Sequence, residues 1–131
     1  MFGWFKSVLE EPLNPERALD CYRRGAFKEA LRRAEAILEL GPEVALSWRF
    51  KGECLVSLDR YVEAVKCFEK SEAIGGPGTE DVFLWKALAL YNGGSRATAR
   101  RVLMKFLDSD SQDAELIQQA ENTLRDFGVS A

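Results

Sequence analysis

The chain has 131 residues, of which 47% are apolar and 30% are charged, and its formal net charge at pH 7 is −3. This length is typical of one domain that buries a core without disulfides or metals. The composition excludes a collagen-like, mucin-like or wholly disordered chain, and four prolines leave room for long helices.

Charge and histidine content narrow the function classes. Nucleic-acid-binding domains usually carry a basic face and a high pI, whereas this chain has a pI near 5.1. We therefore expect no nucleic-acid partner. Histidine is absent, which removes the commonest general base and the commonest metal ligand. We expect no metal, no cofactor and no enzymatic activity.

The cysteines are Cys21, Cys54 and Cys67, an odd number without a CxxC pair. This count and spacing fit neither a zinc site nor a disulfide framework, so we expect reduced, buried thiols in a cytoplasmic protein. The N-terminus lacks the apolar run and cleavage site of a signal peptide. No stretch reaches the ~20 apolar residues of a membrane span.

Residues 1–11 form an amphipathic N-terminal segment that is rich in aromatic side chains. At ~100° per residue, the apolar side chains fall on one arc and the polar ones on the other. Three roles stay open: capping the edge of the following helices, docking in a groove of this chain or of a sister subunit, or lying on a membrane. Acidic neighbours of its one lysine disfavour anionic lipid. The residues expected to dock are Phe2, Trp4 and Phe5.

The rest of the chain repeats itself. At an interval of 34 residues, Phe27 falls on Tyr61 and Ala30 falls on Ala64. A third copy follows at an interval of 35 residues, in which Ala99 takes the place of Ala64, and the glycine-rich stretch before it absorbs the extra residue. Repeats of this length are typical of stacked helical hairpins, because one hairpin cannot bury its apolar face alone.

Each copy is predicted to form two helices, separated by breaks at glycine and proline. Ala18, Gly52 and Ala87 on the first helices are small enough to let the second helices approach closely. A last helix is expected to have Asp110 or Ser111 as its N-cap. In chain order the predicted helices cover 15–24, 28–40, 45–58, 61–74, 80–92, 95–107 and 112–126, and a short helix over 2–10 stays open.

The second copy carries Trp48, Gly52, Ala64 and Phe68 at set intervals, and Pro77 follows one place late. With this pattern the chain resembles the tetratricopeptide repeat family. The resemblance implies an all-α fold, namely a right-handed superhelical stack of antiparallel helix pairs. It implies a single domain at 12–131, with repeats at about 11–44, 45–79 and 80–113 and a capping helix at about 112–126.

The chain departs from the family pattern before the small residue of each first helix. Where the family has leucine, this sequence has Arg17, Lys51 and Lys86. Phe50 and Trp85 stand just before the two lysines, so the apolar position is displaced by one residue.

The resemblance implies a protein-binding role, with the partner on the concave face that the first helices line. We expect a non-enzymatic interaction module, such as an adaptor, scaffold or chaperone-like carrier, that holds an apolar peptide or helix. Internal packing on the chain's own termini is the alternative for the same side chains. The expected groove residues are Leu19, Tyr22, Arg23, Arg49, Glu53, Val56, Leu84, Leu88 and Tyr91.

Some members of the family clamp the terminal carboxylate of chaperones with lysine, arginine and asparagine on the concave face. We expect no such clamp here, because the corresponding places hold Pro15, Leu19, Phe50, Asp81 and Trp85.

Two other function classes stay open. A self-assembling structural protein would place the aromatic N-terminus of one chain in the groove of another, as a homodimer. An enzyme would have to rely on Cys54, on Cys67 or on the acidic run at 108–113. A cysteine nucleophile needs a base or a positive site, and the acidic run lacks the spacing of a calcium loop.

Overall fold

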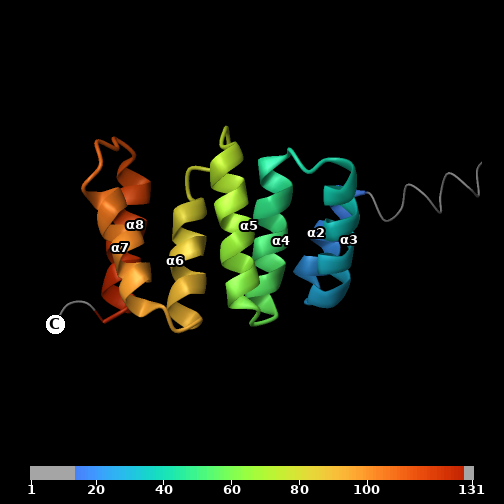
Figure 1. Ribbon diagram of the computed structural model, residues 1–131, viewed down its shortest axis with the longest axis horizontal. Helices are drawn as coiled ribbons and strands as arrows, with labels where there is room; N and C mark the ends of the chain where they lie inside the picture. Colours follow the sequence, from blue (N-terminus) through green and yellow to red (C-terminus); the bar gives the residue numbers. More distant parts are fainter. Residues whose placement is uncertain (1–13, 129–131) are drawn as a thin grey trace, which may run out of the picture.

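The computed structural model describes residues 14–128, and every regular element within them is an α-helix. Figure 1 shows a row of packed antiparallel helix pairs that runs from α2 and α3 at one end to α7 and α8 at the other. This confirms the predicted all-α stack. In chain order the helices are α2 (Pro15–Arg23), α3 (Phe27–Leu40), α4 (Ala45–Ser57), α5 (Tyr61–Ile74), α6 (Val82–Asn92), α7 (Arg96–Leu107) and α8 (Ala114–Asp126).

The helix α8 begins two residues later than the predicted 112, and its predicted cap is wrong. Asp113 is the N-cap, and its carboxylate accepts a hydrogen bond of 3.0 Å from the backbone N–H of Leu116. The hydroxyl of Ser111 instead accepts from the backbone N–H of Asp113 at 3.3 Å. The acidic run therefore contains the cap of a helix, because a carboxylate satisfies an otherwise unpaired N–H there.

The helix α6 also begins two residues later than predicted, at Val82. Ahead of it, the carboxylate of Glu80 accepts from the backbone N–H of Gly78 at 2.9 Å and so closes a turn. Asp81 holds the N-cap position without capping, since its carboxylate contacts Arg49 of α4. A contact between two repeats therefore decides how this helix starts.

The two helices of each pair meet at small, buried residues. Gly52 is the tightest point, because a Cβ built on it would lie 2.5 Å from Cε1 of the buried Phe68 ring. Interaxial distances of ~8–10 Å depend on the side chains at the crossing, so larger residues there would separate the helices. The corresponding buried residues of the stack are Ala18, Ala30, Ala64, Ala87 and Ala99.

The core consists of two clusters that meet on α6. The first extends from α2 to α6 and contains the fully buried Phe68 ring. The second joins α6, α7 and α8 around Leu103 and Phe127. Ala89 belongs to the first cluster and Ala87 to the second, so α6 connects the two. Within residues 14–128, no helix has the length and apolar character needed to cross a membrane.

We expect Gly52→Ala to lower the free energy of unfolding by about 1–3 kcal/mol, because the new methyl group would overlap the Phe68 ring. Urea denaturation followed by circular dichroism measures the change. Gly41→Ala is the control, since a Cβ there would meet no atom closer than 3.5 Å. A loss at Gly41 as large as that at Gly52 would contradict the close helix approach.

Candidate functional site

The predicted groove residues belong to the first helices α2, α4 and α6, and we call the surface of these three helices the groove face. Its most exposed large apolar side chains lie on α2 and α4. There Leu19 exposes 38% and Leu46 exposes 50% of its surface. An apolar pocket of about 360 Å³ lies between α2, α3 and α4 beside them. Its lining residues are Pro15, Ala18, Leu19, Ala34, Ile37, Leu46, Ser47 and Phe50.

Of the nine predicted groove residues, Leu19 lines this pocket, whereas Ile37 and Phe50, which also line it, were not among them. Phe50 could have been found from the sequence, because the displaced apolar position before Lys51 already marked it. Ile37 could not, since it lies on a second helix, where the face toward a groove depends on how the pairs pack.

Tyr22 links the first two repeats rather than standing free. Its ring lies 5.3 Å from the Phe27 ring in an edge-to-face arrangement and 5.8 Å from the Phe50 ring. The hydroxyl of Ser57 donates to the Tyr22 hydroxyl at 3.4 Å. These contacts fix α2 against α3 and α4 and hold Phe50 at the wall of the pocket.

At the polar centre of the face, Arg49 of α4 forms an ion pair with Asp81 at the start of α6, and we call this pair the Arg49–Asp81 strut. The Arg49 guanidinium makes two hydrogen-bonded contacts with the Asp81 carboxylate, at 2.7 and 2.9 Å, and donates to the carbonyl of Gly78 at 2.7 Å. Glu53 lies 3.7 Å from Arg49. Burial raises the pKa of Glu53, while the nearby Arg49 opposes the shift. Paired charges of this kind position helices.

At the α6 end the face is covered by the chain itself. The Tyr91 ring stacks on the Phe127 ring, with centroids 4.0 Å apart and planes at 5°. The Tyr91 hydroxyl donates to the Phe127 carbonyl at 3.3 Å. Leu84 and Leu88 pack partly buried against the second core cluster, whereas Val56 packs against the first. Tyr91 therefore joins α6 to the C-terminal end of α8.

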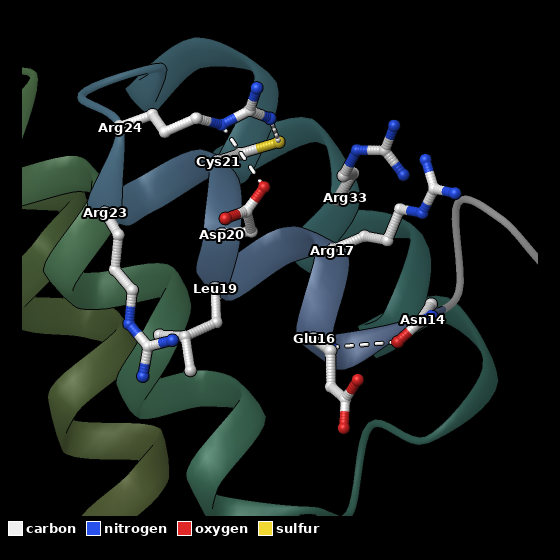
Figure 2. A pocket seen from close by; sticks show the side chains of 9 residues that line it. All are labelled: Asn14, Glu16, Arg17, Leu19, Asp20, Cys21, Arg23, Arg24 and Arg33. Atoms are coloured by element: carbon white, nitrogen blue, oxygen red, sulfur yellow. Dashed lines mark hydrogen bonds and ion pairs between the residues drawn. The ribbon is translucent and has the colours of Figure 1, made fainter.

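A polar pocket of about 600 Å³ lies at the α2–α3 end of the stack, and Figure 2 shows it. Arg24 pairs with Asp20 at 3.2 Å, and Arg23 is exposed. Most of the side chains that line this pocket are charged and exposed, so they would bury little of a ligand, and the apolar pocket is the better candidate. The residues of the polar pocket are Asn14, Glu16, Arg17, Leu19, Asp20, Cys21, Arg23, Arg24 and Arg33.

The predicted docking residues Phe2, Trp4 and Phe5 lie outside the described residues, as does the open helix over 2–10. Their three alternative roles stay predictions.

Cys54 and Cys67, the two cysteines considered as nucleophiles, are poorly suited to that chemistry. Burial, with a smaller contribution from Glu53, raises the pKa of the Cys54 thiol to about 12. Burial also raises the pKa of Cys67. A thiol with a raised pKa carries almost no thiolate at neutral pH. Between residues 14 and 128, no group of carboxylates and thiols is arranged to hold a metal ion.

Comparison with solved structures decides the fold. The TPR2B domain of yeast Sti1, in its complex with pHsp70, matches with a TM-score of 0.77 and 15% identity over 94% of this chain and 98% of that domain. The chain has the tetratricopeptide-repeat fold. The Yersinia enterocolitica type III secretion translocator chaperone SycD also matches this chain, with a TM-score of 0.73 and 17% identity over 94% of this chain and 93% of that one.

Comparison of sequences finds less similarity than comparison of structures. The Pseudomonas aeruginosa cytochrome c-type biogenesis protein CycH is 25% identical over 75 residues, which is 57% of this chain. The matched part is 18% of the length of that curated relative. No protein-family model matches the chain.

We expect the Arg49–Asp81 pair to contribute a coupling of about 1 kcal/mol to the free energy of unfolding, reduced from a buried pair because Asp81 is partly exposed. A double-mutant cycle with Arg49→Met and Asp81→Asn, measured by urea denaturation, gives this value. The exposed Arg60–Glu63 pair is the control, and its coupling should be smaller. Equal couplings would contradict a role for Arg49 in joining the repeats.

We expect the free energy of unfolding to fall as the pH rises from about 9 to about 12, in part because of Cys54. In that range the unfolded chain loses the thiol proton while the folded chain keeps it, so high pH favours unfolding. Urea denaturation across this range should give a shallower pH dependence for Cys54→Ala than for the parent. Parallel curves would show that the Cys54 thiol titrates alike in both states.

Proposed function

We propose that this chain is a non-enzymatic protein-interaction module that binds an apolar segment of a protein partner on the face formed by α2, α4 and α6. The observation that supports this most is the open apolar pocket beside Leu19, Leu46 and Phe50. Exposed apolar surface in a concave site is costly unless a partner covers it. An amphipathic helix or apolar peptide would bury its own apolar side chains there.

Internal contacts prepare this face for binding. Tyr22 holds Phe50 in place, and the Arg49–Asp81 strut fixes α4 against α6. A site that is already ordered loses little conformational entropy when it binds. The exposed Arg23 at the edge would then influence register and orientation more than affinity.

The fold neighbours support a peptide or protein as partner, since one is a complex with pHsp70 and the other is a translocator chaperone. The pocket itself favours an apolar ligand over a chaperone carboxylate, because its lining carries no basic side chain. We therefore place the chain among adaptors, scaffolds or chaperone-like carriers, and in the cytoplasm.

The proposal is tested by selecting peptides on the intact chain from a displayed random library. We expect the selected sequences to be rich in leucine and aromatic residues at helical spacing. Their affinity should fall at least about tenfold for the double variant Leu19→Glu, Leu46→Glu, because a carboxylate in the pocket opposes apolar contact. Val62→Glu is the control, since Val62 is 69% exposed on α5.

Equal binding by the double variant and the control would contradict the groove. If a selected peptide halves the mass seen in light scattering, a sister chain occupies the groove at rest, and the self-assembly alternative holds instead.

A further inference from the structure

A second surface lies on the other side of α4 from the groove. Lys51 and Glu53 are two residues apart and so point about 200° apart around the helix. On the Lys51 side, a pocket of about 630 Å³ lies between α4 and α5. We call it the Trp48 pocket, and its residues are Trp48, Lys51, Glu63, Lys66, Cys67, Glu69, Lys70 and Ala73.

The Trp48 ring is held in one orientation in this pocket. Its indole N–H donates to the carbonyl of Pro42 at 2.7 Å, which sets the orientation of the ring. The ammonium groups of Lys51 and Lys70 lie over the ring, 5.7 and 5.9 Å from its centroid, as cation–π contacts. A ring that stacks on Trp48 would displace one of these flexible side chains toward a carboxylate of the ligand. Among residues 14–128, no second ring stacks on Trp48, and no carboxylate forms an ion pair with these two lysines.

The third repeat has an equivalent pocket of about 510 Å³, with Phe83 and Lys86 in the places of the tryptophan and the first lysine. In that pocket the chain supplies two further groups. The Phe106 ring stacks on Phe83, with centroids 4.1 Å apart and planes at 24°. The carboxylate of Glu72 accepts from the Lys86 ammonium at 2.7 Å.

The Trp48 pocket lacks both of these groups. The position of Phe106 is taken by Ser71, whose buried hydroxyl donates to a backbone carbonyl at 2.9 Å. In the repeat before, the residue equivalent to Glu72 is Leu38, which is buried and carries no charge that could pair with Lys51. One repeat therefore contains the ring and the carboxylate that the other leaves out.

We propose that the Trp48 pocket binds an acidic, aromatic peptide segment of a protein partner. The ring of the segment stacks on Trp48, as Phe106 does on Phe83, and a neighbouring carboxylate pairs with Lys51 or Lys70. Stacked rings and charge-assisted hydrogen bonds are the contacts that such a site offers.

The charges around the pocket favour a peptide over a nucleic acid. Glu63 also lines the pocket, but it already pairs with Arg60 at 2.7 Å, so the lysines are in excess. Glu63 and Glu69 would repel a continuous phosphate backbone, whereas one carboxylate between apolar side chains can avoid them. The surface is separate from the groove, so it would serve a second partner.

The test is fluorescence anisotropy of the full chain with a short labelled peptide that alternates Asp and Phe. Two control peptides replace Asp by Asn, which removes the charge, or Phe by Ala, which removes the ring. We expect the parent peptide to bind and each control to bind at least about tenfold more weakly, because each loses one of the two contacts.

The matched variants are Lys70→Glu and Lys105→Glu, which make the same charge change at equivalent, exposed positions of the two pockets. We expect Lys70→Glu to weaken binding by at least about tenfold and Lys105→Glu to change it by less than about twofold. Trp48→Ala should abolish binding, and circular dichroism checks that each variant stays folded.

Several outcomes would overturn the proposal. One is that no peptide binds, and another is that both lysine variants lose affinity equally, which indicates a general charge effect. Tighter binding of a single-stranded oligonucleotide at the same pocket would indicate a nucleic acid instead. Loss of binding in Leu19→Glu, with Lys70→Glu unaffected, would place the peptide in the groove. Unchanged binding in Leu19→Glu supports a separate site, whatever the groove binds.

Discussion

The close contact between Gly52 and the Phe68 ring is the constraint on which the rest of the stack depends. It lets α4 and α5 approach until their buried faces interlock, and buried alanines do the same in the other pairs. Because every pair has the same narrow crossing, the pairs can be repeated in a row. Each of the first helices α4 and α6 then has one side toward the groove and another toward a pocket that it forms with the second helix of its own pair.

The helices α4 and α6 thus each contribute to two surfaces, and the chain's own side chains cover these surfaces to different extents. On α6 both sides are largely occupied from within, by Phe127 on the groove side and by Phe106 on the other. On α4 both sides stay open, with the apolar pocket beside Phe50 and the Trp48 pocket opposite. The binding capacity that we propose is therefore concentrated on α4, which the Arg49–Asp81 strut holds in place.

The two largest departures from the predicted helix starts, at α6 and α8, have different causes, because α8 starts after a local cap at Asp113 whereas α6 depends on a contact between repeats. Sequence reasoning placed α6 and α8 two residues early, because it judged the turns by local signals. In the structure Asp81 gives its carboxylate to Arg49, a residue of the preceding repeat, and Glu80 closes the turn before it. A choice between capping a helix and pairing with a distant arginine is made in three dimensions.

The sequence by itself determined the fold class and the seven helices within residues 14–128, to within two residues at their starts. These follow from the repeat interval and from small residues at set places, which are local and periodic features. Only the tertiary structure decided which side chains of the first helices find a partner within the chain. Lys86 has Glu72 and Phe83 has Phe106, whereas Lys51 and Trp48 have neither counterpart. The reason is physical: such partners lie on neighbouring helices, and packing between helices rather than spacing along one helix brings them together.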